Sequence, residues 1–248
     1  MIAPPRAFTH PGSYWQASRA PRYSLLFALP LLVLYESLAA LLAPERGGVR
    51  NGADVLIKGL VAMVAGPYAV LAVGLLLIGG SLWLVVRDLR RHHGGLRARV
   101  FGGMVVESVV LALVFGVVVG VVTAQLLGSL AAVQGGVSLG WWTQLTVSLG
   151  AGLYEELLFR VLLVSLFAWG GRRVLGWRPA AASTVAVLLS ALVFSAFHYI
   201  GPYGDRLELS SFAFRAVAGL FFSALYVLRG FGITAWTHAL YDVFLLVL

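Results

Sequence analysis

The chain has 248 residues, of which 60% are hydrophobic and only 11% are charged, and its mean hydropathy is +0.92. Soluble domains contain about 25% charged residues, so this composition excludes an ordinary soluble protein and indicates a polytopic membrane protein. The formal net charge of +8 does not indicate a nucleic-acid partner, because the arginines lie in short stretches between apolar runs, as the positive-inside rule predicts. The absence of cysteine excludes disulfides, a thiol nucleophile and thiolate metal ligands.

The N-terminal elements are a polar tail and two apolar segments. Residues 1–22 are basic and contain prolines without helical periodicity, so we expect a cytoplasmic tail. Residues 23–43 form an apolar run of about 20 residues, which is long enough to span a bilayer and too long for a usual signal peptide. Residues 53–86 are apolar for more than one crossing, with Gly66-Pro67 as an interruption. We expect a short interfacial or re-entrant helix there, followed by a span from about Pro67.

Five further apolar runs complete the chain. We expect spans at about 100–127, 145–168, 180–200, 212–228 and 233–248. The sequence therefore predicts an all-α bundle of about seven spans that forms a single transmembrane domain, residues 23–248. With the N-terminus inside, most of the 18 basic residues fall on one side of the membrane. We expect a multi-pass protein of a prokaryotic inner membrane with a cytoplasmic N-terminus, and the sequence does not define its oligomeric state.

Three charged residues interrupt the span at 145–168. Each of Glu155, Glu156 and Arg160 costs about 2.5–3.5 kcal/mol at mid-membrane, which favours a polar site inside the bundle. On an α-helix, Glu156 and Arg160 lie within about 40° of each other, so we expect a buried ion pair that fixes the helix. Glu155 faces another direction and has no partner on its own helix. An unpaired buried carboxylate suits the role of a general base.

Two histidines lie in the later spans. His198 is near the end of the span at 180–200, with Phe194 one turn earlier on the same face. His238 is in the last span, with Asp242 four residues later, a spacing that lets the carboxylate accept a hydrogen bond from the imidazole and fix its tautomer. An interfacial histidine or a helix-packing hydrogen bond would explain each spacing without chemistry. Together with Glu155, however, these residues are expected to converge on one wet cavity.

Two further expectations concern the depth of His198 in the membrane and the roles of three other charged residues. The helix at 180–200 must continue into residues 200–204, or its boundaries must shift, to bring His198 level with the glutamates. Glu36 and Glu107 have no arranged partner in the sequence, so we expect structural or interfacial roles for both. Arg215 is expected to snorkel to the outer surface.

Three short motifs follow one another on successive late spans. They are Glu155-Glu156-x-x-x-Arg160, Phe194-x-x-x-His198 and His238-x-x-x-Asp242. In this order they resemble the CPBP family, the CAAX-protease and bacteriocin-processing (Abi) group that includes the Rce1-type prenyl-protein endopeptidases. The resemblance covers a core at about residues 145–248, and Val161 departs from it, because many members have glycine after the arginine.

The resemblance implies an intramembrane glutamate protease that needs no metal. Glu155 would be the general base, and His198 would help it to position and activate a water molecule. His238 and Asp242 would stabilise the oxyanion of the tetrahedral intermediate. Many members have asparagine at the last position, and an ionised Asp242 would repel an oxyanion. Asp242 therefore orients His238 or is itself protonated, and His238 is expected to be the main donor. The residues expected to support the site are Glu156, Arg160 and Phe194.

Several alternatives and partners accompany this interpretation. Glu155, His198 and His238 could also hold zinc at an open site, although the chain has no His-Glu-x-x-His motif. An aspartyl protease would use Asp205 and Asp242, but the first of these lies in a loop and lacks the Gly-x-Gly-Asp context. A non-enzymatic scaffold, peptide-immunity factor or transporter could use the same buried polar site. The expected partners are the lipid bilayer and a hydrophobic, prenylated or C-terminal-signal peptide substrate.

Overall fold

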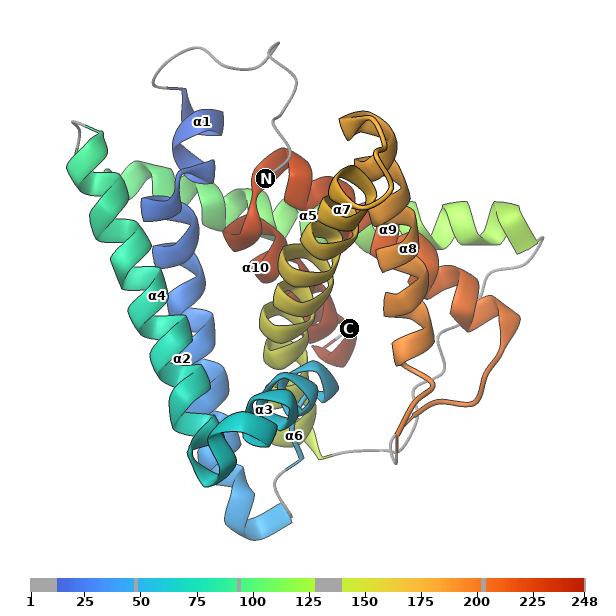
Figure 1. The fold of residues 1–248 in the computed structure, drawn as a ribbon. Helices are drawn as coiled ribbons and strands as arrows, with labels where there is room; N and C mark the ends of the chain where they lie inside the picture. Colours follow the sequence, from blue (N-terminus) through green and yellow to red (C-terminus); the bar gives the residue numbers. More distant parts are fainter. Residues whose placement is uncertain (1–12, 47–48, 93–94, 128–139, 202–203, 248) are drawn as a thin grey trace.

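The computed structural model describes residues 13–46, 49–92, 95–127, 140–201 and 204–247, and no strand occurs among them. The expected all-α helix bundle is confirmed (Figure 1). The α-helices are α1 (Tyr14–Arg19), α2 (Pro21–Arg46), α3 (Gly52–Ala65), α4 (Ala69–Arg91), α5 (Ala98–Leu127), α6 (Trp141–Gly150), α7 (Val164–Arg173), α8 (Pro179–Phe197), α9 (Leu209–Arg229) and α10 (Phe231–Val247). A 3₁₀ turn, η2 (Gly66–Tyr68), joins α3 to α4, and a π-helix, η3 (Ala151–Leu163), joins α6 to α7.

Five helical segments in the described residues are long and apolar enough to cross a membrane. They are Pro21–Ala43, Gly52–Arg91, Ala98–Leu127, Pro179–Phe197 and Leu209–Arg229. Two further segments were expected as spans and do not belong to these five. One is the continuous run of α6, η3 and α7, which we call the central helix (residues 141–173), and the other is the shorter apolar helix α10. The chain is therefore a multi-pass membrane protein.

The segment at the N-terminal end differs from the expected tail. Within the described part of residues 1–22, Tyr14–Arg19 form α1, and the hydroxyl of Ser13 caps this helix by accepting a hydrogen bond from the Gln16 N–H. α1 packs against α2, α5 and α9. Six helical residues are too few to produce a recognisable apolar period, so the sequence did not indicate this contact with the bundle.

The expected interruption in the second apolar segment is confirmed. Gly66 has a φ of +55°, which favours glycine, and Pro67 lies in the 3₁₀ turn that follows. In Figure 1, α3 lies across the ends of α2 and α4 instead of continuing the direction of α4. This orientation brings the start of α3 toward the central helix, with which it packs.

The central helix separates two groups of helices. In Figure 1, α2 and α4 lie on one side of it and α8 and α9 on the other. α10 packs against η3, and Gly152 permits this contact, because a Cβ there would lie 2.4 Å from the carbonyl oxygen of Ala235 and 2.6 Å from the Cβ of Ala239. The backbones of η3 and α10 are therefore in close contact, and both helices carry residues of the candidate site.

Candidate active site

Glu155, Glu156 and Arg160 lie on a π-helix, whereas the sequence analysis assumed a regular α-helix. At the end of η3 the Val164 N–H donates to the carbonyl of Phe159, five residues earlier. Such π-helical segments are rare and frequently occur at functional sites. The expected ion pair is nevertheless confirmed, because the Arg160 Nε lies 3.2 Å from Glu156 Oε2.

The Arg160 guanidinium is completely buried among aromatic rings. Its central carbon lies 4.4 Å from the centre of the Phe194 ring, and its Nη2 donates to the carbonyl of Gly219 at 3.4 Å. A cation over an aromatic face is stabilised by the quadrupole of the ring. Phe194 therefore contacts Arg160 directly, and its ring also meets His198 edge to face, with 4.9 Å between the ring centres.

Glu156 also contacts His238, and the sequence analysis did not predict this interaction. Its Oε1 lies 2.7 Å from the Nδ1 of His238, so the imidazole donates from Nδ1 to the carboxylate. The expected hydrogen bond to Asp242 does not form, because 3.8 Å separates His238 Nε2 from Asp242 Oδ2. The His238 ring stacks on Phe222, with 4.3 Å between centres. Glu156 thus fixes the tautomer and the orientation of the imidazole.

Glu155 lies between Asn51 and His198. Its Oε1 accepts a hydrogen bond of 2.8 Å from the side-chain amide of Asn51, and its Oε2 lies 3.9 Å from the Nε2 of His198. Oε2 is buried and accepts no hydrogen bond from the described residues. One carboxylate oxygen is therefore held by the protein, while the other faces an imidazole at a distance too long for a direct hydrogen bond.

His198 reaches Glu155 from the C-terminal end of α8. Of the two alternatives for bringing His198 level with the glutamates, the continuation of the helix into residues 200–204 does not occur, because α8 ends at Phe197 and His198 is its C-cap. The Nδ1 of His198 lies 2.8 Å from the carbonyl of Phe194. A carbonyl only accepts hydrogen bonds, so Nδ1 carries the proton, and in the neutral ring the lone pair of Nε2 faces Glu155.

Solvent access differs among the candidate residues. The side chain of His198 is 26% exposed, and that of Asp242 is 27% exposed. The side chain of Glu155 is only 8% exposed and that of His238 only 7%. The site therefore has a solvent-accessible edge at His198 and Asp242 and a buried floor at the two other groups.

Asn51 is the residue of this site that sequence reasoning missed. It caps α3, since its Oδ1 accepts a hydrogen bond of 2.9 Å from the Ala53 N–H. In the sequence it is an ordinary N-cap before an apolar run, 104 positions from Glu155. Gly150 lets it approach the central helix, because a Cβ at Gly150 would lie 2.7 Å from the Cβ of Asn51.

Four charged residues beside Asn51 form a cluster that we call the α2–α3 charge cluster. Its members are Glu36, Arg50, Asp54 and Lys58. Lys58 Nζ lies 2.8 Å from Glu36 and 2.7 Å from Asp54, and Tyr154 of η3 donates to Glu36. The Tyr35 hydroxyl donates to Asp54 at 2.7 Å and accepts from the Asn51 N–H at 3.2 Å. The cluster thus supports the backbone from which Asn51 reaches Glu155.

The structure supplies partners for two charges outside the motifs, Glu36 and Glu107, and corrects the expectation for a third. Glu36 has arranged partners, as described above. Glu107 also has them, because Arg229 Nη2 donates to it at 2.7 Å and the Tyr14 hydroxyl at 2.6 Å. Arg215 pairs with Asp205 and its side chain is only 12% exposed, so it does not snorkel to a surface.

Among the described residues we find no group of three or more His, Cys, Asp or Glu side chains arranged as metal ligands. The residues that come together are three carboxylates, two imidazoles, an arginine and an amide. They lie in the interior of a bundle of apolar helices. The fold and the site therefore define a multi-pass membrane protein with a buried glutamate–histidine centre.

Comparison with known families identifies this centre further. Residues 136–244 match the family described as type II CAAX prenyl endopeptidase Rce1-like, which confirms the resemblance that the motifs indicated. Searches of curated proteins and of solved structures gave no match. The family match implies a membrane protease of the CAAX type. All candidate residues from the motifs lie inside the matched region, whereas Asn51 lies outside it.

Proposed function

We propose that the protein is an intramembrane endopeptidase in which Glu155 and His198 activate a water molecule. The observation that carries this proposal is the 3.9 Å between Glu155 Oε2 and His198 Nε2. Both atoms are hydrogen-bond acceptors, the first as a carboxylate oxygen and the second through its lone pair. A water molecule has two protons, and one water at about 2.8 Å from each atom closes a gap of this size.

Proton transfer and attack follow from this geometry. Glu155 takes one proton from the water, and the water oxygen forms a bond to the carbonyl carbon of the scissile peptide. The carbonyl oxygen becomes the oxyanion of a tetrahedral intermediate. When the carbon–nitrogen bond breaks, Glu155 returns the proton to the leaving amine, so that the carboxylate is regenerated.

His238 is the proposed donor to the oxyanion. Its Nδ1–H is engaged by Glu156, so only Nε2 is left to face the substrate. Nε2 donates when the ring is an imidazolium, and the neighbouring carboxylates of Glu156 and Asp242 stabilise that charge. In this proposal Asp242 acts on the imidazolium through charge, and it does not itself contact the oxyanion.

Asn51 is a positioning residue in this proposal. Its amide holds Oε1 of Glu155, which directs Oε2 toward His198. A carboxylate that rotated freely would lose the alignment with the imidazole on which the shared water depends.

The proposed substrate is a hydrophobic or lipid-modified peptide, such as a prenylated C-terminal tail or a C-terminal sorting signal. The Rce1-like match supports this class, and a buried site between apolar helices suits a substrate that arrives from the bilayer. We propose the inner membrane of a prokaryotic cell with the N-terminus in the cytoplasm, which the distribution of basic residues supports. The proposed reaction needs no metal.

The test is cleavage by the purified full chain in proteoliposomes, with product masses that map the cut. A farnesylated peptide ending in a CAAX sequence and an unmodified hydrophobic peptide are the first substrates. Glu155→Gln should lower kcat by at least about 10²-fold, and His198→Ala should do likewise. Glu208→Gln, an equal change at an exposed carboxylate, should retain activity. Undiminished cleavage by Glu155→Gln would overturn the proposal and leave a binding or scaffold function for the site.

A further inference from the structure

A second site, with an apolar part and a polar end, lies on the side of the central helix that faces α2 and α4. It is a cavity of about 490 Å³ between α2, α4, the central helix and the junction of α9 with α10. Cavities of this size are typical of small-molecule sites. None of Glu155, His198, His238 and Asp242 lines it, so it is distinct from the candidate active site.

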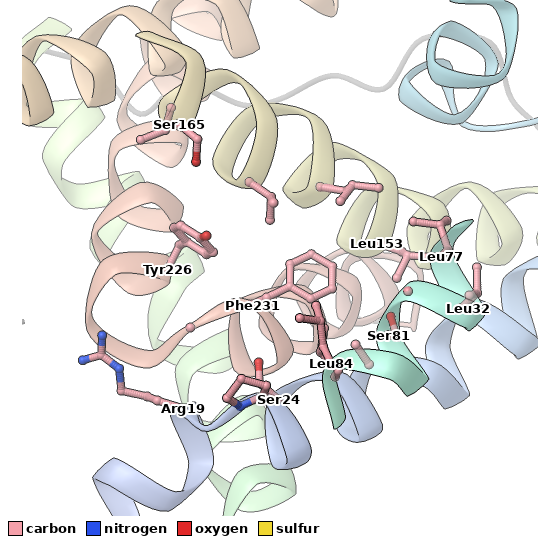
Figure 2. A pocket seen from close by; sticks show the side chains of 18 of the residues that line it. Arg19, Ser24, Leu32, Leu77, Ser81, Leu84, Leu153, Ser165, Tyr226 and Phe231 are labelled. Carbon is pink, nitrogen blue, oxygen red and sulfur yellow. The ribbon is translucent and has the colours of Figure 1, made fainter. Parts of the chain in front are cut away.

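The walls of this cavity are largely apolar. Figure 2 shows Leu32, Leu77, Leu84, Leu153 and Phe231 along one part of it, and these side chains come from α2, α4, the central helix and α10. Along α2 the lining extends from Pro21 to Leu32, a rise of about 16 Å at 1.5 Å per residue. The cavity therefore extends along about three turns of α2. The principal apolar lining residues are Leu29, Leu32, Leu77, Leu84, Leu153 and Phe231.

Polar groups gather at the other end of the cavity. In Figure 2, Arg19, Tyr226 and Ser165 lie on the side away from Leu32 and Leu77. Arg172 of α7 also lines the cavity. The Tyr226 hydroxyl makes no hydrogen bond with the described residues, so it is available to a ligand.

Arg19 is a half-buried cation without an acidic partner among the described residues. Burial lowers the pKa of its guanidinium, and repulsion from Arg229 lowers it further. Arg229 is itself paired with Glu107, so that carboxylate is already used. A charge held in this way is stabilised by an anion that the protein does not supply.

This polar end is also the basic end of the bundle. The C-terminal turn of α4 carries Arg90 and Arg91, and that of α7 carries Arg172 and Arg173. The positive-inside rule assigns such an end to the cytoplasmic side. The cytoplasmic leaflet is rich in anionic lipids, whose headgroups are attracted to arginines near the surface.

We propose that this cavity binds one anionic phospholipid of the cytoplasmic leaflet, with its phosphate on Arg19 and Tyr226 and an acyl chain along α2 and α4. A neutral hydrocarbon would leave Arg19 uncompensated, and a free anion would leave the apolar walls in contact with water. An amphipathic anion satisfies both parts of the site. The proposal does not depend on the proposed proteolysis, since its test measures lipid binding.

The experiment is native mass spectrometry of the detergent-purified full chain, titrated with phosphatidylglycerol or with phosphatidylcholine of identical acyl chains. Wild type should bind phosphatidylglycerol more tightly. Arg19→Gln should weaken that binding about fivefold, the equivalent of about 1 kcal/mol per arginine near a membrane surface, and should remove the headgroup preference. Arg173→Gln, an equal change of charge at an exposed residue that does not line the cavity, should bind as wild type does.

A second pair of variants tests the apolar part. Gly80 lines the cavity and Gly79 does not, and a Cβ at either position would meet open space. Gly80→Leu should fill the cavity and reduce the binding of both lipids, whereas Gly79→Leu should not. Equal binding by these two variants, or by Arg19→Gln and wild type, would overturn the proposal. Displacement of the phospholipid by farnesyl-cysteine at equal concentration would overturn it too, because it would assign the cavity to substrate.

Discussion

The side-chain amide of Asn51 donates a hydrogen bond of 2.8 Å to Glu155, which is 104 positions later in the chain. The contact joins the start of α3 to the π-helical part of the central helix. It leaves one oxygen of the carboxylate without a hydrogen bond from the described residues, and that oxygen faces His198. Asn51 lies outside the region that matches the family and Glu155 lies inside it, so the two parts of the chain meet at this carboxylate.

Asn51→Ser should separate capping from positioning. Serine keeps the N-cap of α3 but is too short to hold Glu155. Losing a hydrogen bond to a charged group costs about 1.5–3 kcal/mol, so we expect kcat to fall roughly tenfold or more, with KM and the melting temperature close to wild type. Steady-state kinetics and thermal unfolding in the same detergent measure both. A rise in KM with unchanged kcat would contradict the positioning role.

Glu156→Gln should destabilise the bundle as well as the site. It leaves the fully buried Arg160 without its counter-charge, and removing one partner of a buried pair costs about 3–5 kcal/mol. The double variant Glu156→Gln, Arg160→Met removes both charges, so it should unfold at a higher temperature than the single variant. Thermal unfolding of the three proteins in one detergent makes the comparison. A single variant as stable as the double variant would show that the ion pair is not needed.

Gly152→Ala should separate α10 from η3. The added Cβ would lie 2.4 Å from the Ala235 carbonyl oxygen, so one backbone must move, and His238 moves with α10. We expect lower activity and a lower melting temperature. Gly170→Ala in α7 is the matched control, since its Cβ meets nothing within 4 Å and alanine is the better helix former. Its melting temperature should equal or exceed that of wild type.

Chelation should leave the proposed proteolysis unchanged. In the proposed mechanism Glu155 and His198 bind the attacking water directly, so incubation with a strong zinc chelator should not alter the rate. The measurement is the cleavage rate before and after dialysis against the chelator, and again after zinc is added back. Loss of activity that zinc restores would favour the alternative in which Glu155, His198 and His238 hold the metal.

The sequence predicted those parts of the site that depend on spacing within one helix. Glu156 and Arg160 are four residues apart, and their ion pair forms even though the helix is a π-helix there. Hydropathy likewise predicted an all-α bundle and the break at Gly66-Pro67, because both are local properties of the chain.

Contacts between distant segments could not be predicted in this way. Asn51 has the pattern of an N-cap, and nothing in its neighbourhood indicates a carboxylate 104 positions away. Glu107 meets Arg229 across 122 positions. His238 forms its hydrogen bond with Glu156 and not with Asp242. The close approach of α10 to η3 at Gly152 brings the Glu156 carboxylate nearer to the imidazole than Asp242, which is one turn later on α10. Tertiary packing decides such choices.

The α2–α3 charge cluster also has a consequence for biogenesis. Each of its charges would resist entering the lipid alone, but Glu36 finds Arg50 and Lys58 only 14 and 22 residues later. All four charges lie within residues 36–58, so they can pair with one another before Glu155, 97 positions after Lys58, is synthesised. The segment of α2 and α3 can therefore enter the membrane with these charges paired, before the central helix brings Glu155 to Asn51.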